Sequence, residues 1–311
     1  QAAAEGEEEK DDEPPPAEEA PPPPPKRKRL SKEFREFLFY LLFLAAFGAV
    51  VFGPRGADPF FTRSALDQQF LGNDYDKGIN YLGTASVSQV WQWIDAIMLP
   101  NVYPTAWYND EPRRGDARRQ ITDLHNFRLG AARLRALRVK PCTAEHLTSY
   151  FQPLLGGDRC YPRYVGECAS MASGETTEDT ADWVNPHPGD TAGVLPAAIA
   201  YQDATATGEA PFFSPHTRIS YCAGGQVVDL PSDLANASAV ARALWNSTWV
   251  DRSVRALLFE VNLYNANTDM VTVLRHCVEM TAEGAIVPSY SVHIAPLLRL
   301  TRAVENDGVP M

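Results

Sequence analysis

The sequence predicts an α+β fold: an antiparallel β-sheet with helices packed on it, preceded by one apolar helix. Two neighbouring segments of alternating apolar residues, 256–264 and 270–280, are separated by an Asn-rich turn, which is typical of a β-hairpin. Two other segments, 87–98 and 233–244, carry apolar residues at helical spacing. Residues 37–52 form an uninterrupted apolar run.

Residues 1–30 are predicted to be a disordered tail that ends in a basic cluster. Residues 1–25 contain eight prolines, nine acidic residues and one lysine, with no aromatic or β-branched side chain. Such a segment buries too little apolar surface to offset the entropy lost on ordering. Lys26-Arg27-Lys28-Arg29 follows, so these 29 residues account for −4 of the formal net charge of −11. The remainder is mildly acidic and offers no basic face for phosphates, so we expect no nucleic-acid partner.

Residues 31–54 are predicted to be a membrane-spanning helix. The run from Phe37 to Phe52 has sixteen residues without a charge, and it reaches nineteen when counted from Phe34. A buried helix of a soluble domain is the alternative, but it does not explain the apolar residues on every side or the dense basic flank. Five Lys and Arg residues lie between Lys26 and Lys32, so the positive-inside rule predicts a cytosolic N-terminus and an extracellular location after about residue 54.

Residues 55–300 are predicted to form one extracellular domain. Its first helix spans residues 87–98, with Ser86 or Ser88 as the cap and an end at Pro100. Its second helix spans residues 233–244, with Ser232 as the N-cap.

Three further segments of the domain alternate as strands do. Residues 133–140 alternate between basic and aliphatic side chains and predict a strand with one basic face. In residues 256–264 one face carries only apolar side chains, and in residues 270–280 one face carries Leu274, His276, Val278 and Met280. Residues 153–217 are rich in Gly, Pro, Thr and Asp and are interpreted as a loop-rich insertion.

The sequence lacks the common catalytic and cofactor motifs. It contains no G-x-S-x-G, no H-E-x-x-H, no Walker A loop and no strand-led G-x-G-x-x-G. The six histidines are scattered, and each is interpreted as packed or solvated rather than as a ligand. A calcium loop starting at Asp74 fails because Ile79 stands where the turn glycine is required. We therefore predict a protein that is not an enzyme, with no cofactor and no metal site.

The cysteines fit an oxidising compartment. Cys142, Cys160, Cys168 and Cys222 lie in one region without a C-x-x-C pair, so neither a zinc site nor a thioredoxin-like site is indicated. Four cysteines allow three disulfide pairings, and spacing alone does not choose among them. Cys277 lies in an apolar strand-like run and is predicted to be a buried thiol.

Two N-x-[ST] sequons begin at Asn236 and Asn246. Two in this length is near what chance gives, but beyond a membrane helix they become candidate glycan sites. Asn246 lies between Trp245 and Trp249, so packing of these side chains around it would block its modification.

A series of short motifs runs through most of the chain, from the apolar helix to about Leu300. The most specific ones are Trp249-Val250-Asp251-Arg252, Tyr264-Asn265-Ala266-Asn267 and Gly284-Ala285-Ile286-Val287-Pro288-Ser289. The others are Phe60-Phe61-Thr62-Arg63, Val90-Trp91-Gln92-Trp93-Ile94, the Leu129–Val139 strand with one R-x-R spacing and a third arginine at Arg138, and Gly225-Gln226-Val227-Val228-Asp229-Leu230. This series resembles the polycystin family, in particular the polycystin-2 type.

The resemblance implies the first membrane helix of a channel followed by its extracellular polycystin domain. In that family the domain is an α+β lid, and four lids pack over the pore of a tetrameric cation channel, often in cilia. The implied function is assembly and gating of a ciliary, calcium-permeable, non-selective cation channel. The implied partners are other subunits, in a homotetramer or with a polycystin-1-like partner, and the lipid bilayer, with extracellular glycoproteins of the cilium surface as further candidates.

The resemblance also implies a disulfide between Cys142 and Cys160, which follow the basic strand as in the family. A second pair, Cys168 with Cys222, is not required by the family. The basic face is interpreted as an assembly interface that meets an acidic surface of a neighbouring subunit. A strand face with local acidic partners is the alternative. The candidate interface residues are Arg128, Arg133, Arg135 and Arg138.

The family chain continues into five further membrane helices, whereas residues 301–311 here are polar. This chain is therefore expected not to form a cation pathway by itself and is interpreted as a fragment of a longer channel. The alternative function is a pore-less, membrane-anchored ectodomain that binds an extracellular glycoprotein or wall component.

Overall fold

The computed structural model describes residues 31–52, 58–142, 160–166 and 176–297, and of residues 49–52 the backbone alone. The chain divides into two units, Gln1–Pro54 and Arg55–Met311. The predicted tail and the polar end fall outside the described residues.

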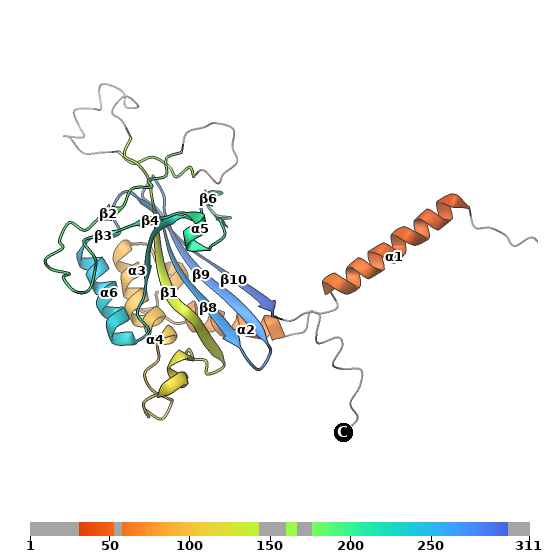
Figure 1. Cartoon of the computed structure of the whole chain (residues 1–311), viewed down its shortest axis with the longest axis horizontal. Coiled ribbons are helices and arrows are strands. Elements are labelled where there is room, and N and C mark those ends of the chain that lie inside the picture. Colours follow the sequence, from red (N-terminus) through yellow and green to blue (C-terminus); the bar gives the residue numbers. More distant parts are fainter. Residues whose placement is uncertain (1–30, 53–57, 143–159, 167–175, 298–311) are drawn as a thin grey trace, which may run out of the picture. The chain divides into compact units, whose positions relative to one another are not determined.

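The first unit contains one helix, α1 (Lys32–Phe52), among its described residues (Figure 1). Its side chains up to Phe47 are exposed, and large apolar ones such as Phe39 and Leu42 are among them. Over the part of the chain that the structure describes, no helix is both long enough and apolar enough to cross a membrane. The membrane span stays a prediction.

The second unit is built on a six-stranded antiparallel sheet with the strand order β10-β9-β8-β1-β7-β4 (Figure 1). The strands are β1 (Asn126–Arg138), β4 (Tyr201–Gln202), β7 (Gly225–Asp229), β8 (Val254–Asn265), β9 (Met270–Met280) and β10 (Ile286–Pro296). Strands β8 and β9 pair in the predicted hairpin, from Ala256 opposite Glu279 to Asn265 opposite Met270. The mixed helix and antiparallel-sheet class is confirmed.

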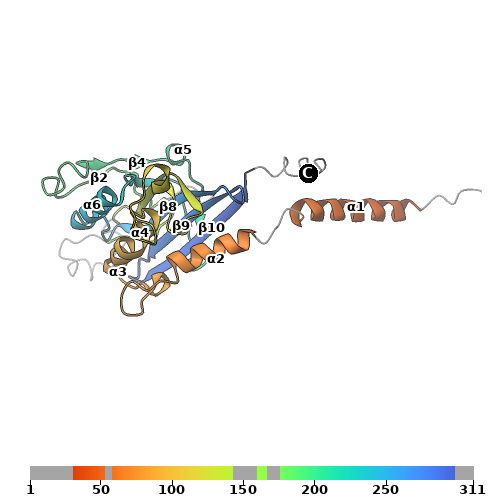
Figure 2. The same cartoon turned by 90° about the horizontal axis from the view of Figure 1, so that it is seen from below.

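One face of the sheet is covered by helices (Figure 2). These are α2 (Asp58–Phe70), α3 (Val87–Trp93), the π-helical turn η2 (Ile94–Met98), α4 (Leu99–Val102) and α6 (Leu234–Asn246). The main core lies between the two layers and contains Leu257, Phe259, Val261 and Leu263, the apolar face predicted for β8. The alternation of that strand therefore identifies the core face correctly.

The first predicted helix continues through Pro100 instead of ending there, since η2 and α4 follow α3 directly. Proline cannot donate a hydrogen bond to the preceding turn. In η2 the Leu99 N–H bonds to the Ile94 carbonyl, five residues back, so the pairing has already shifted when Pro100 is reached. Ser86, one of the two predicted caps, accepts a hydrogen bond from the Gln89 amide.

The second predicted helix is capped by Asp233 rather than by Ser232. The Asp233 carboxylate accepts hydrogen bonds from the Asn236 backbone amide at 2.9 Å and from its side-chain amide at 2.8 Å. A carboxylate at this position also faces the positive end of the helix dipole, which a serine hydroxyl does not exploit. The hydrogen bonds from Asn236 hold the pKa of the Asp233 carboxyl below its usual value.

Among the longer elements of the domain, periodicity does not predict helix α2 or strand β10. In α2 the aromatic pair Phe60 and Phe61 is exposed while Leu66 and Phe70 are buried, so the apolar residues do not keep to one side. Strand β10 contains Pro288, which argues against a central strand. It is tolerated because β10 lies at the edge of the sheet.

His276 lies on the core face of β9 without a hydrogen-bond partner among the described residues. Its ring is about 1% exposed and packs against Phe70, Tyr81 and Trp93, with ring centroids 5.6, 5.1 and 5.0 Å away. Burial lowers the pKa of His276 to about 3. The histidine is therefore a neutral packing residue, as its place on the apolar face predicts.

We predict that His276 makes the domain sensitive to acid. Its pKa is lower in the folded state than in the unfolded state, so the unfolded state binds the extra proton. This contribution is complete above about pH 6.5 and falls by up to about 1.4 kcal/mol per pH unit as the pH drops toward 3. His276→Phe keeps a ring and removes the titration. Urea unfolding near neutral pH and near pH 4.5 will show a smaller acid-induced loss in the variant, and equal losses would contradict this assignment.

Candidate functional site

The second face of the sheet is covered by loops. We call residues 160–166 and 176–224 the loop layer. It contains β2 (Trp183–Val184), β3 (Ala198–Ile199), the edge strand β4, α5 (Ala204–Thr207), β5 (Phe212–Phe213) and β6 (Ser220–Tyr221). Trp183 of β2 and Ile199 of β3 pack into the main core, so this hairpin is held there rather than on the second face. A second apolar cluster joins the two layers, with Leu258 and Cys277 from the sheet and Tyr164 and Tyr221 from the loops. Of the predicted insertion of residues 153–217, residues 153–159 and 167–175 lie outside the described part.

A row of charged side chains crosses the sheet beneath the loop layer. Asp229 of β7 lies opposite Arg133 of β1, and Arg133 lies opposite Glu260 of β8. Glu260 in turn lies opposite Arg275 of β9. The row alternates in sign across four strands, and facing opposite charges stabilise a sheet. Together with two neighbours we call it the charge network: Arg133, Arg135, Glu209, Asp229, Glu260 and Arg275.

Glu260 is at the centre of the charge network. Its carboxylate accepts hydrogen bonds from Arg135, at 2.6 Å from Nη2 and 3.1 Å from Nε. The Nε of Arg275 lies 2.7 Å from Glu260 Oε1, an ion pair without hydrogen-bond alignment. The Arg135 and Glu260 side chains are 0% and 5% exposed. Burial alone raises the pKa of the Glu260 carboxyl, but the hydrogen bonds and charges of the two arginines outweigh it and hold the pKa below its usual value.

The charge network reaches the loop layer through Glu209. Its carboxylate accepts a hydrogen bond from Arg275 Nη2 at 2.9 Å, and its other oxygen lies 4.0 Å from Arg133 Nη1. Arg133 also donates to Asp229 at 2.8 Å and to the Thr207 carbonyl at 2.9 Å. Three guanidinium groups thus face three carboxylates, so the network is formally neutral. This balance offsets part of the cost of removing the charges from water.

Arg135 also fixes the backbone where the loop layer enters β7. Its Nη1 donates to the carbonyls of Cys222 and Gly224, at 2.9 and 3.0 Å. Gly225 follows with a φ of 142°, and a Cβ there would lie 2.8 Å from the Ala136 carbonyl oxygen. This position therefore requires glycine, because only glycine permits both the conformation and the close approach.

The shorter part of the loop layer is held by Arg255 and by a disulfide. Arg255 donates to the carbonyls of Tyr161 and Pro162 at 2.7 and 2.9 Å. Cys142 and Cys160 are joined, with their Cα atoms 5.4 Å apart. This is the pairing that the family resemblance implies.

Of the other cysteines, Cys277 is a buried free thiol, as predicted. Burial raises the pKa of this thiol, so it stays protonated. Cys222 is buried and takes part in a disulfide. Cys168 lies outside the described residues, so its pairing with Cys222 stays a prediction.

The interpretation of Arg128, Arg133, Arg135 and Arg138 as an exposed basic face is wrong. Arg128 and Arg138 are each 4% exposed, Arg135 is fully buried, and Arg133 is mostly covered. The alternating pattern suggests a half-exposed strand, but the loop layer covers Arg133 and Arg135, and Arg128 and Arg138 lie toward the helix-covered side. A neighbouring subunit therefore has no access to a basic surface made by these side chains, and the alternative of local acidic partners applies to most of them.

Arg128 and Arg138 bond mainly to backbone carbonyls at the helix-covered side of the domain. Arg128 donates to the carbonyls of Val102 and Ser232 at 2.9 and 3.0 Å. Arg138 donates to the Trp249 carbonyl and pairs with Asp251 at 2.9 Å. Burial lowers the pKa of both guanidinium groups. Both groups nevertheless remain positively charged, because arginine is not deprotonated in proteins.

The two candidate glycan sites lie at opposite ends of α6 and are both exposed. Asn236 is in the first turn, where Asp233 holds its side chain. Asn246 is the last residue of the helix, and the neighbouring tryptophans do not bury it. Modification of either residue stays a prediction.

The charged groups of this face are suited to hold two layers together. Within the described ranges, no group of three His, Cys, Asp or Glu side chains is arranged to hold a metal ion. The carboxylates of the charge network are bonded to arginines, and the arginines to carboxylates or carbonyls. The arrangement fixes the position of the loops on the sheet.

Sequence reasoning misses Glu260, Arg275 and Glu209 as members of this site. Glu260 is placed on the outer face of its strand by alternation, but that face is covered and the side chain is buried. The available signal is that Arg135 and Glu260 are charges in the middle of otherwise apolar strands, which need partners when buried. Glu209 lies in the insertion, where no periodicity predicts its partner.

Comparison with known proteins agrees with the sequence motifs. The family described as Polycystin domain matches residues 80–298. The chain is 26% identical to Polycystin-2-like protein 1 of Homo sapiens over 266 residues, which are 85% of this chain and 30% of that protein. It is 25% identical to Polycystin-2 of Danio rerio over 272 residues, 87% of this chain and 27% of that protein. It is also 24% identical to Polycystin-1-like protein 3 of Mus musculus over 85% of this chain and 11% of that protein. The chain thus spans less than a third of the length of these relatives.

We predict that Glu260, at the centre of the charge network, contributes much more to the free energy of unfolding than Asp229 at its half-exposed end. Glu260→Gln removes the buried carboxylate charge and leaves Arg135 uncompensated, which costs about 3–5 kcal/mol of unfolding free energy. Asp229→Asn is the matched control at the half-exposed end, where a loss of at most about 1 kcal/mol is expected. Urea unfolding of the purified chain at neutral pH measures both, and equal losses would refute the central position of Glu260.

Proposed function

The chain belongs to the polycystin family, and we propose that it forms the membrane-anchored assembly module of a polycystin-type channel subunit. The matched domain and the folded second unit support this assignment together. Calcium-permeable, non-selective conduction is proposed for the complete channel, of which this chain supplies the part that assembles and takes part in gating. A ciliary membrane is the proposed location.

The proposed anchor is α1. Its large apolar side chains have no polar side to turn toward water, and the basic cluster at residues 26–29 precedes it. Basic residues beside an apolar helix favour the cytosolic side, so we propose that the second unit is extracellular or luminal. The disulfide between Cys142 and Cys160 fits such an oxidising compartment.

The loop layer is the proposed assembly surface, and its exposed apolar side chains carry this proposal. Val184 and Phe213 are 70% and 59% exposed, and Val165 and Val194 are also exposed. An interface core needs apolar side chains of this kind, surrounded by polar ones. The charge network holds the backbone near Phe213 through Glu209 and the Cys222 carbonyl, and Trp183 in the main core holds the backbone beside Val184. These side chains are therefore presented on a fixed backbone, and less entropy is lost on association.

The proposed partners are other channel subunits, either further copies of this chain in a tetramer or a polycystin-1-like chain. A closed ring requires a heterologous contact, in which the loop layer of one subunit meets a different surface of the next. Anchoring in a bilayer confines the subunits and raises their effective concentration. Extracellular glycoproteins are a further proposed class of partner.

The topology can be tested by protease protection. In sealed microsomes, protease added outside is expected to remove the acidic tail of residues 1–25 while the second unit stays intact until detergent is added. The physical reason is the basic cluster, which resists transfer across the bilayer. A protected tail with a digested domain would contradict the proposed orientation.

Assembly can be tested by placing charges on the loop layer. Val184→Asp combined with Phe213→Asp is expected to lower the association constant of the membrane-extracted chain at least tenfold, because a charge buried without a partner costs several kcal/mol. Native mass spectrometry and cross-linking measure the oligomer fraction.

The matched control is Tyr108→Asp, which changes an exposed aromatic residue outside the loop layer. It is expected to assemble as the unaltered chain does. The proposal fails if the double variant assembles normally, or if Tyr108→Asp weakens assembly to the same extent. Equal urea midpoints of all three chains establish that the fold is retained.

A further inference from the structure

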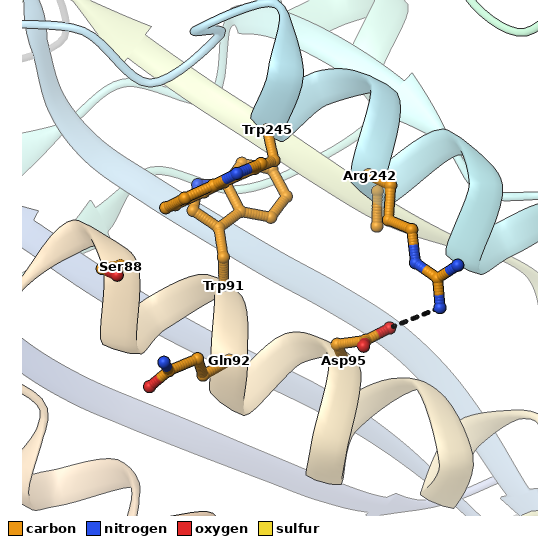
Figure 3. Close-up of a pocket in the computed structure, with 7 residues that line it drawn as sticks. Ser88, Trp91, Gln92, Asp95, Arg242 and Trp245 are labelled. Carbon is orange, nitrogen blue, oxygen red and sulfur yellow. Dashed lines mark ion pairs between the residues drawn. The ribbon is translucent and has the colours of Figure 1, made fainter.

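A small groove opens between α3 and α6, on the helix-covered side of the domain. It has a volume of about 220 Å³ and is lined by Ser88, Trp91, Gln92, Asp95, Ala241, Arg242 and Trp245. Figure 3 shows the rings of Trp91 and Trp245 lying against each other between the two helices, with Asp95 and Arg242 paired beside them. The ring centroids of Trp91 and Trp245 are 6.1 Å apart, in an edge-to-face arrangement.

The groove leaves a large aromatic surface uncovered. Trp91 is almost buried, but Trp245 is 44% exposed. Around it lie an amide, a hydroxyl and the solvent-exposed Asp95–Arg242 pair, whose charged atoms are 4.0 Å apart. The surface therefore combines one apolar aromatic face with a polar rim, the combination that orients small ligands.

This chemistry matches a sugar ring. A pyranose carries C–H groups on one face, which are attracted to the negative face of an aromatic ring, and hydroxyl groups along its edge. The groove is smaller than the roughly 300–1,000 Å³ typical of pockets for drug-sized ligands. It is suited to one sugar unit laid against Trp245 rather than to a deeply buried ligand.

An attachment point for a sugar lies directly beside the groove. Asn246 follows Trp245, opens the sequon Asn246-Ser247-Thr248, and is exposed at the end of α6. It lies four residues after Arg242, a lining residue, and residues four apart are neighbours on one side of a helix. We propose that an N-linked glycan on Asn246 packs its first sugars against Trp245 and closes this groove. The inference rests on the proposed extracellular or luminal location, where such glycans are added.

The other sequon of the same helix provides an internal comparison. Asn236 lies ten residues earlier, at the opposite end of α6, and no residue of its turn lines the groove. Its side chain is held by Asp233 at 2.8 Å. A glycan there projects into solvent, so its removal is expected to leave the packing of the domain unchanged.

The test compares chains made in cells that add N-glycans. Thr248→Ala removes the sequon at Asn246 without changing the groove, and Ser238→Ala removes the one at Asn236. Loss of the Asn246 glycan is expected to lower the melting temperature by about 2–4 °C and to increase quenching of tryptophan fluorescence by acrylamide. Loss of the Asn236 glycan is expected to change neither. Enzymatic deglycosylation of the unaltered chain must reproduce the effect of Thr248→Ala, which excludes an effect of the substitution itself.

A double-mutant cycle isolates the contact with the ring. In a Trp245→Ala background, removal of the Asn246 glycan is expected to leave the melting temperature unchanged, because the partner surface is gone. If the glycan stabilises the chain equally with and without Trp245, it acts through general solvation, and the proposed contact is overturned. An unmodified Asn246 in an otherwise glycosylated chain overturns it as well.

A reporter sequon separates failure of this inference from failure of the proposed location. Glu111→Thr creates an acceptor at Asn109, beside the exposed Tyr108. If Asn109 carries a glycan and Asn246 does not, the location stands and the inference alone is overturned. If Asn109, Asn236 and Asn246 all remain unmodified, the extracellular or luminal location is contradicted, and the inference is overturned with it.

Discussion

The attachment of the loop layer to the sheet depends on one buried ion pair, between Arg135 of β1 and Glu260 of β8. Both side chains are removed from water, so each charge requires the other to offset the cost of its burial. Because the sheet brings Arg133, Arg275 and Asp229 into the same row, the pair does not stand alone but is extended to both sides. Because its charges are paired, this polar face in the centre of the sheet can be covered by the loop layer.

The consequence is a domain with two different covers on one sheet. Helices pack on the apolar face by ordinary burial of side chains such as Phe259 and Trp93. The opposite face carries loops, which are held by a smaller apolar cluster and by arginine bonds to carbonyls, for example those of Cys222 and Tyr161. The exposed side chains of a loop fixed in this way are available for contacts with other molecules, which is the physical basis for proposing the loop layer as the assembly surface.

The sequence predicts this arrangement in part, and the limits have physical causes. Strict alternation identifies β8 and β9 and their core face because apolar burial on one side leaves a local pattern. Pro288 argues against a strand, so the pattern does not predict the edge strand β10. Pro100 predicts a helix end, whereas the π-helical turn before it lets the helix continue from α3 into α4. The role of Arg135 is hidden for a different reason: alternation states which residues share a face, not whether a distant insertion covers that face. Only the partner positions in β8 and in the insertion distinguish a buried arginine from an exposed one.

The most direct test of this account is amide hydrogen exchange in a chain with Arg135→Met and Glu260→Met. Replacing both charges by apolar groups is expected to keep global stability close to that of the unaltered chain, because no unpaired charge remains. We predict that amides of residues 201–224 then exchange much faster, while amides of β8 and β9 retain their protection. Unchanged protection of residues 201–224 would contradict the claim that the charge network holds the loop layer on the sheet.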